Sequence, residues 1–126
     1  MNLTLQTDSL AICRLDADSR VPAWATTAGC FLSITRTTDE LSIVCVDTVV
    51  PSGVRHEPGW RAFKLEGPLD LALTGILASL LEPLARAQIS IFAVSTFDTD
   101  YILVKASQTE AAVQALRAAG HKVQTG

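Results

Sequence analysis

The sequence predicts an α+β protein in which two helices cover one face of an antiparallel sheet. From residue 61 onward the patterns follow the order strand, helix, strand, strand, helix, strand (βαββαβ). Within this order, two leucine- and alanine-rich segments carry apolar residues at helical spacing. In addition, Ser33–Val44 (SITRTTDELSIV) echoes Val94–Val104 (VSTFDTDYILV), since each joins two strand patterns through a Thr/Asp-rich turn. The first half therefore looks like a trimmed version of the second, and we expect one domain over residues 1–60 and another over residues 61–126.

Composition restricts the classes of partner. The 126 residues are 48% apolar and carry a net charge of −3, with ten scattered Lys and Arg, so clustered contacts to nucleic-acid phosphates are not expected. No apolar run reaches the roughly 18–20 residues that a membrane helix needs. The N-terminus does not have the pattern of a secretory signal.

The cysteines Cys13, Cys30 and Cys45 have no metal-ligand spacing. We expect a cytoplasmic protein with reduced thiols and with no metal or cofactor.

The first half is rich in short strand patterns. Strands are expected at Leu3–Gln6, Leu10–Leu15, Phe31–Thr35 and Leu41–Val46, with a helical turn at Val21–Ala25. The segment Thr48–Trp60 contains two prolines and two glycines and is expected to be an irregular connection. His56 is then expected to be a solvated loop histidine.

The first helix of the second half is expected after a strand at Arg61–Leu65. Asp70 is placed to cap it, because its side-chain oxygen can accept from a free amide of the first turn. Gly75 in its interior costs about 1 kcal/mol relative to alanine and indicates a close neighbour. Pro83 is expected to kink or restart its last turn.

The rest of the second half contains two strands and a second helix. Strands are expected at Ile89–Ser95 and Tyr101–Lys105. Ser107 and Glu110 have the spacing of a capping box for the helix that follows. Gly120 ends that helix and Val123 begins a last strand.

Two turns concentrate the polar residues that a ligand would need. These are Glu66–Asp70 (EGPLD) and Ser95–Tyr101 (STFDTDY). A carboxylate suits the free amides of Leu71–Leu73 after Gly67-Pro68, where the helix dipole is positive. Asp98 and Asp100 suit a cation, and Phe97 could supply an apolar wall or a ring face. The alternative is that these Thr/Asp-rich turns simply form hairpins and hydrogen-bond their own backbone.

Nothing in the chain indicates catalysis. No nucleophile, histidine or metal-ligand set accompanies the two aspartates, so we expect a protein that is not an enzyme. The alternative to ligand binding is a module that docks on an enzyme through a sheet face or edge. Because small sheets commonly pair with a second copy, a homodimer is expected.

The residues Trp60–Val123, centred on GWRAFKLEGPLDLALTGIL and ISIFAVSTFDTDYILVK, resemble the small ACT-domain proteins of bacteria. TRTTDELSIV in the first half matches the same family. The pattern is also similar to the tandem ACT units of the animal cytosolic arginine sensor and of aspartate kinase regulatory regions. The resemblance implies a ferredoxin-like ACT domain over residues 61–126, preceded by a degenerate ACT-like unit over residues 1–60.

The resemblance also implies a function. ACT modules are non-catalytic regulatory units that bind an amino acid between two such units and pass the signal to an enzyme, here a separate chain. The family's ligand contacts fall on Asp70–Thr74, Thr96, Phe97 and Asp100. With the residues argued above, the predicted contacts are Gly67, Asp70, Leu71, Ala72, Leu73, Thr74, Thr96, Phe97, Asp98 and Asp100. The arginine sensor has an acidic residue where Leu73 stands, so the resemblance does not name the amino acid.

Overall fold

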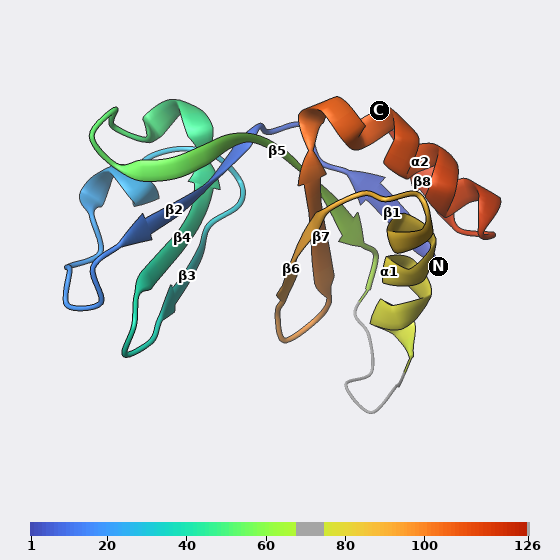
Figure 1. Cartoon of the computed structure of the whole chain (residues 1–126), viewed down its shortest axis with the longest axis horizontal. Helices are drawn as coiled ribbons and strands as arrows, with labels where there is room; N and C mark the ends of the chain where they lie inside the picture. Colours follow the sequence, from blue (N-terminus) through green and yellow to red (C-terminus); the bar gives the residue numbers. More distant parts are fainter. Residues whose placement is uncertain (68–74, 126) are drawn as a thin grey trace. The chain divides into compact units, whose positions relative to one another are not determined.

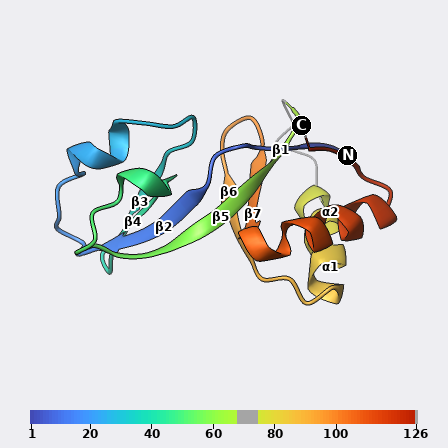
Figure 2. The same ribbon diagram turned by 90° about the horizontal axis from the view of Figure 1, so that it is seen from above.

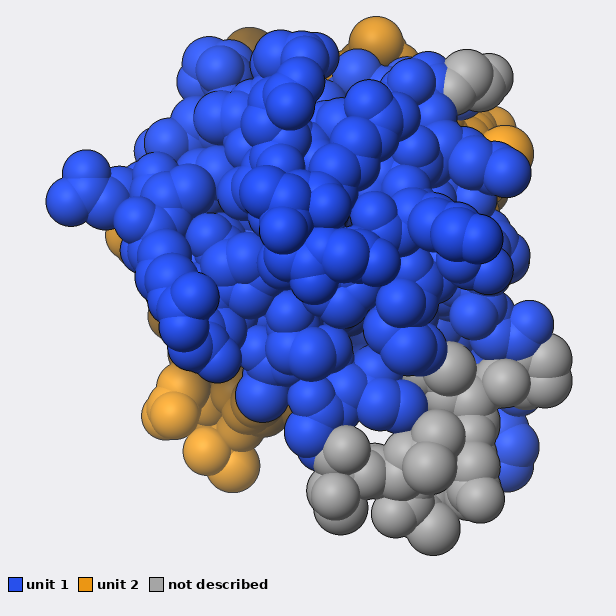
Figure 3. Space-filling view, turned by 90° about the vertical axis from the view of Figure 1, so that its right-hand side faces the viewer, with its two compact units in different colours: residues 1–7, 61–126 blue, residues 8–60 orange. Residues whose placement is uncertain are grey.

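The computed structural model describes residues 1–67 and 75–125 and divides into two compact units (Figure 1). The C-terminal unit combines Met1–Thr7 with Arg61–Gly126, and the N-terminal unit is Asp8–Trp60. Figure 3 colours the former blue and the latter orange. Strand β5 contributes residues to both units, since it runs from Arg55 to Leu65.

The described residues of the C-terminal unit form a sheet in the order β8-β1-β5-β7-β6. Its other strands are β1 (Asn2–Leu5), β6 (Ile91–Ser95), β7 (Asp100–Lys105) and β8 (Lys122–Gln124). The helices α1 (Ile76–Arg86) and α2 (Thr109–Ala118) lie on the same side of this sheet in Figures 1 and 2. The predicted α+β class, with helices on one sheet face, is confirmed.

Strand β1 is an interior strand of this sheet, between β5 and β8, although it is the first strand in sequence order. Leu3 is opposite Leu65 of β5 in an antiparallel pair and beside Val123 of β8 in a parallel pair. The sequence analysis placed this strand with residues 1–60, whereas its pairing places it with residues 61–126. The predicted antiparallel pattern therefore has one parallel pair, β1 with β8.

The core of the C-terminal unit lies between the sheet and the helices. The sheet contributes buried residues at alternate positions, among them Leu3, Leu5, Phe63 and Leu65. The helices contribute Leu80, Leu84, Ala112, Val113 and Leu116. Each large side chain that is fully buried in this way favours folding by about 1.5–3 kcal/mol.

Helix α1 differs from its prediction at both ends. Gly75 is not inside the helix: it precedes Ile76 with φ of 76°, a conformation that glycine adopts at little cost. Pro83 lies inside, and the helix continues to Arg86. Because proline has no N–H, the carbonyl of Ser79 loses its usual partner in the helix. His121 Nε2 donates to that carbonyl at 3.1 Å.

Helix α2 begins without the predicted capping box. A 3-10 turn, η3 (Ala106–Gln108), leads into it, and the residue at its N-cap, Gln108, makes no side-chain capping bond. The predicted end is confirmed at Gly120, which has φ of 95°. Helix α2 thus starts by continuing a 3-10 turn rather than by a serine cap.

The N-terminal unit is an antiparallel sheet in the order β3-β4-β2-β5. Its elements besides β5 are β2 (Leu10–Leu15), η1 (Ala23–Thr26), β3 (Ser33–Arg36), β4 (Leu41–Val46) and η2 (Asp47–Val49). The predicted hairpin is present, with Ile34 opposite Ile43. The unit has a core of its own, formed by Ala11, Cys13, Ala25, Leu41, Ile43 and Cys45.

The prediction of an irregular connection up to Trp60 is wrong for its second part. Strand β5 begins at Arg55 and continues through Pro58 and Gly59. Leu10 is opposite Trp60 and Ile12 is opposite Glu57, so β5 has one extra residue there, a β-bulge. A bulge tolerates proline, and Gly59 has φ of 79°. Pro58 and Gly59 therefore form a bulge within β5 and do not end the strand.

His56 therefore lies in strand β5 and not in a loop. It is half-buried and stands opposite Cys13 of β2. Its Nδ1 donates to the Val54 carbonyl at 2.6 Å. The ring is held by the residue that precedes its strand, so its position is explained without a ligand.

Leu3→Ala should destabilise the protein by about 2–5 kcal/mol, because it opens a cavity in the C-terminal core. Urea unfolding followed by circular dichroism measures this change. Leu32→Ala is the matched control, because Leu32 is 44% exposed and its truncation should cost less than about 0.5 kcal/mol. Equal effects of the two substitutions would show that β1 is not part of the folded core.

Candidate functional site

A hydrogen bond joins the β6–β7 turn to the end of β5, directly before the EGPLD segment. Thr99 is the one polar residue of the β6–β7 turn that is buried, with 6% of its surface exposed. Its hydroxyl donates to the carbonyl of Leu65, the last residue of β5. Because Glu66 and Gly67 follow directly, this bond holds the turn that carries Phe97 and Asp98 beside the start of the EGPLD segment.

The β6–β7 turn is closed by its own hydrogen bonds. The Thr96 amide donates to the Thr99 carbonyl at 2.8 Å. The Thr99 amide in turn donates to Thr96 Oγ1 at 3.3 Å. Thr96 thus satisfies local backbone groups, as the hairpin alternative requires.

Phe97 and Asp98 lie at the tip of this turn and are exposed. Phe97 has 82% of its surface exposed, the largest value among the large apolar side chains of the described residues. Asp98 is also exposed. The structure brings these two predicted contacts together on a firmly held turn.

Asp100 stands at the first position of β7, opposite Ser95. Ser95 Oγ donates to Asp100 Oδ1 at 2.6 Å. The carboxylate is half-buried, and among the described residues it makes no ion pair. The Ser95 hydroxyl orients the Asp100 carboxylate without neutralising it, so the carboxylate can still bind a cation.

The remaining predicted contacts fall largely outside the described residues. Asp70, Leu71, Ala72, Leu73 and Thr74 are all in the range 68–74 that the structure does not describe. Gly67 is described and exposed, and it follows Glu66. The predicted amide site at Leu71–Leu73 stays a prediction, although α1 itself begins only at Ile76, with Gly75 as its N-cap.

Sequence reasoning missed Thr99 and the partners of Glu66. Thr99 was considered only as a turn former, because a single threonine in a Thr/Asp-rich turn gives no sign of burial. Glu66 accepts from Thr4 Oγ1 at 2.9 Å, and its amide donates to the Asn2 carbonyl at 2.8 Å. Both contacts come from β1, more than 60 positions away in sequence.

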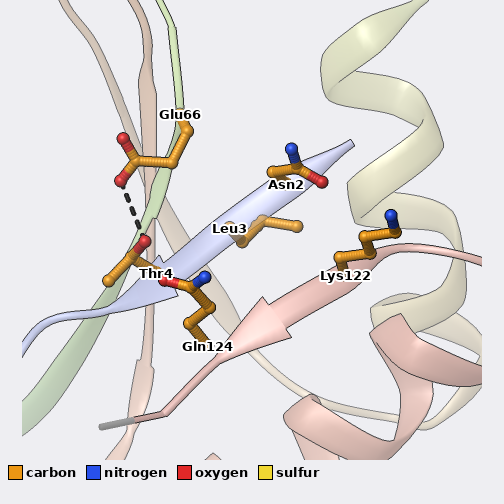
Figure 4. A pocket seen from close by; sticks show the side chains of 6 residues that line it. All are labelled: Asn2, Leu3, Thr4, Glu66, Lys122 and Gln124. Atoms are coloured by element: carbon orange, nitrogen blue, oxygen red, sulfur yellow. Dashed lines mark hydrogen bonds between the residues drawn. The ribbon is translucent and has the colours of Figure 1, made fainter.

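A pocket of about 470 Å³ adjoins Glu66 (Figure 4). We call it the β1–β8 pocket, because it is lined by residues of β1 and β8 together with the residue that follows β5. The lining residues are Asn2, Leu3, Thr4, Glu66, Lys122 and Gln124. No sequence pattern predicts this pocket, since its residues come from three segments that are far apart in sequence.

Residues 1–67 and 75–125 contain no group of three His, Cys, Asp or Glu placed to hold a metal ion. Two of the three cysteines, Cys13 and Cys45, are buried in the core of the N-terminal unit. Burial, and then the neighbouring Cys45 thiol, raise the pKa of Cys13 to about 12. Burial likewise raises the pKa of Cys45. Thiols of this kind are poor nucleophiles and poor metal ligands.

Comparison with known proteins shows the family of this fold. The sequence model of the ACT domain matches residues 55–118, from the start of β5 to the end of α2. The chain belongs to the ACT domain family. A model of an N-terminal domain matches residues 8–53 of this ACT protein. No curated protein matches the chain.

Solved structures with the same fold include bacterial proteins of similar length. A crystal structure of an Agobacterium tumefaciens protein is 45% identical with a TM-score of 0.93, and the match covers 99% of this ACT chain and 92% of the other. A Vibrio cholerae protein of unknown function, described as a possible transport protein, is 18% identical, with a TM-score of 0.76 and coverage of 94% and 88%.

The regulatory subunit of aspartate kinase from Thermus thermophilus, in a ligand-free form, is 12% identical to this ACT protein. Its TM-score is 0.63, with coverage of 94% of this chain and 97% of the other. This likeness shows a shared fold, and the predicted resemblance to ACT proteins is confirmed. None of the helices among the described residues is long and apolar enough to cross a membrane.

Thr99→Val should destabilise the protein by about 1–3 kcal/mol, because it leaves the Leu65 carbonyl without its donor in a buried place. Thr27→Val is the control, because the Thr27 hydroxyl makes an exposed bond to the Trp24 carbonyl. Urea unfolding of both variants compares the two costs. A Thr99 variant as stable as the wild type would mean that the hydroxyl does not hold the turns together.

The free energy of unfolding should fall above pH 9, because the buried thiols stay protonated while the unfolded chain releases their protons. A thiol whose pKa is higher in the folded protein than in the unfolded chain stabilises the fold at pH values below the unfolded-state pKa. This stabilisation is lost between about pH 9 and pH 12. By pH 10 the loss from Cys13 should be about 1 kcal/mol. Urea unfolding at pH 8 and pH 10 measures it. Cys13→Ala should remove this part of the pH dependence, whereas Cys30→Ala, at an exposed thiol, should not.

Proposed function

We propose that this ACT protein is a non-catalytic regulatory protein that binds an amino acid at the paired turns, Glu66–Gly67 and Ser95–Asp100. The observation that carries the proposal is the hydrogen bond from the buried Thr99 to the Leu65 carbonyl. It fixes a turn with two carboxylates and an exposed aromatic ring beside the end of β5. A ligand that bridges the turns would therefore find groups already in place, which lowers the entropic cost of binding.

The chemistry of the β6–β7 turn suits the basic end of an amino acid. Asp100 is held by Ser95 Oγ at 2.6 Å, so its carboxylate can accept from an ammonium or guanidinium group without first reorienting. Asp98 adds a second negative charge at the tip. The ring of Phe97, which is 82% exposed, can cover the apolar part of the ligand or face its cation. The acid end of the ligand is assigned, from the sequence alone, to the amides of Leu71–Leu73.

A regulatory role follows from the family rather than from these contacts. The fold is shared with the aspartate kinase regulatory subunit, a separate chain in Thermus thermophilus. We infer that this protein likewise works as a separate cytoplasmic chain on an enzyme of its own, and that it does so as a homodimer. In such a dimer a second ACT unit would close over the ligand.

A docking module that binds no small ligand is the second candidate. Phe97 favours it, because an aromatic side chain exposed to this extent is also typical of a protein–protein contact. Strand β6 adds to this, since the described residues pair it only with β7 and leave one edge free. The two candidates differ in their response to free amino acids.

A thermal-shift screen of the twenty amino acids should identify at least one that raises the melting temperature. At 100 times its dissociation constant a ligand adds about 2.7 kcal/mol, which raises the midpoint of a domain of this size by several degrees. A folded protein that responds to none of the twenty would favour the docking module.

Asp100→Asn should weaken binding of that amino acid by about 1.5–3 kcal/mol, because the substitution removes a charge and keeps the acceptor for Ser95. Isothermal titration calorimetry measures the loss. Asp39→Asn, in the corresponding β3–β4 turn, is the control and should bind as the wild type does. If both variants bind equally well, the ligand does not use the β6–β7 turn.

A further inference from the structure

The β1–β8 pocket is built from two rows of polar residues on one face of the C-terminal sheet. In the first row the Glu66 amide donates to the Asn2 carbonyl, and Asn2 is beside Lys122. In the second row Thr4 is beside Gln124. Leu3 and Val123, which alternate with these residues, are buried in the core against the helices. The polar side chains therefore point to the opposite face of the sheet, where helices α1 and α2 do not lie.

In the first row, the acidic Glu66 and the basic Lys122 lie on either side of Asn2, which carries a side-chain amide. Neighbouring strands are about 4.8 Å apart, so the backbones of Glu66 and Lys122, two strands apart, are separated by about 10 Å. Figure 4 shows Glu66 on one side of the pocket and Lys122 on the other, with Asn2 between them. The two side chains make no ion pair with each other. Side chains of opposite charge therefore line one pocket, as a molecule that carries both signs would require.

The two charged groups differ in how they are held. Glu66 Oε1 accepts from Thr4 Oγ1 at 2.9 Å, which orients the carboxylate (Figure 4). Lys122 makes no side-chain hydrogen bond or ion pair among the residues that the structure describes. The pocket thus has a fixed anion and a cation that is free to move toward a ligand.

The rest of the lining favours a polar ligand. Asn2 and Gln124 each carry donors and an acceptor, and the side chains of both are without a partner in the described part of the chain. Leu3 is the single apolar residue of the lining. A volume of about 470 Å³ lies within the range of small-molecule sites.

We propose that the β1–β8 pocket is a second binding site, which takes a small polar zwitterion of the size of an uncharged polar amino acid. Lys122 binds the carboxylate of the ligand, and Glu66 binds its ammonium group. Asn2 and Gln124 hydrogen-bond its polar side chain. This site goes beyond the function proposed above. It shares Glu66 with the paired turns, but it uses none of Phe97, Asp98 and Asp100 and lies on β1 and β8 rather than on the β6–β7 turn.

The test uses the full chain, labelled with ¹⁵N, and three probes: L-serine, L-asparagine and L-glutamine. Each probe is raised to about 20 mM, well above a dissociation constant of about 1 mM. We expect at least one probe to shift the amide signals of Asn2, Thr4, Lys122 and Gln124 in a saturable way. The absence of saturable shifts at these amides with all three probes would overturn the proposal.

Lys122→Gln separates this site from the one on the turns, because Lys122 lines the β1–β8 pocket and belongs to neither turn, whereas Glu66 belongs to both sites. Lys122→Gln and Glu66→Gln should each weaken the response at the β1–β8 pocket by about tenfold or more, since each removes a charge-assisted hydrogen bond. Lys64→Gln is the matched control, because Lys64 is opposite Thr4 on the neighbouring strand but does not line the pocket. It should leave the response unchanged, and so should Asp100→Asn.

Three further outcomes would also contradict the proposal. Shifts that persist in both Lys122→Gln and Glu66→Gln would mean that the pocket does not bind the carboxylate and ammonium groups of the probe through these two side chains. Shifts lost in Asp100→Asn but kept in Lys122→Gln would assign the binding to the turns alone. Shifts at these amides that grow with protein concentration and not with the probe would show that a second copy of the chain occupies the pocket.

Discussion

The pairing of β1 between β5 and β8 is the interaction on which the C-terminal unit depends. Strand β1 has four residues and pairs with β5 on one side and with β8 on the other. Its Leu3 and Leu5 belong to the core that packs against the helices. Its other face supplies Asn2 and Thr4 to the β1–β8 pocket. The C-terminal unit is therefore not a continuous segment of the sequence, because its sheet includes β1.

Two further features show how the chain accommodates residues that usually break structure. Pro83 leaves the Ser79 carbonyl without a helical partner, and His121 supplies a donor from beyond the end of α2. Gly59 and Pro58 form a bulge that lets β5 pair with β2 at one end and with β1 at the other. In both places a local loss is offset by a contact from a distant part of the sequence.

The residues of the β6–β7 turn divide into two groups, those that bond within the protein and those that stay exposed. Thr96 and Thr99 are used within the protein, since one closes the turn and the other attaches it to Leu65. Phe97 and Asp98 have no such use and stay exposed, while Asp100 is only oriented by Ser95. A turn in which some polar groups fix the position of the others is suited to recognition, because the exposed groups are presented in a defined arrangement.

The strand and helix order of residues 61–126, the β3–β4 hairpin and the family can all be predicted from the sequence. They follow from local periodicity and turn composition, which involve residues close together in the chain. The β6–β7 turn can be predicted as well, because Thr, Phe and Asp are concentrated there. The pairing of β1, the burial of Thr99 against Leu65 and the pocket lined by Glu66, Asn2 and Lys122 are seen only in the folded chain. Strand pairing joins residues far apart in sequence, and a four-residue strand such as β1 carries no local sign of its neighbours.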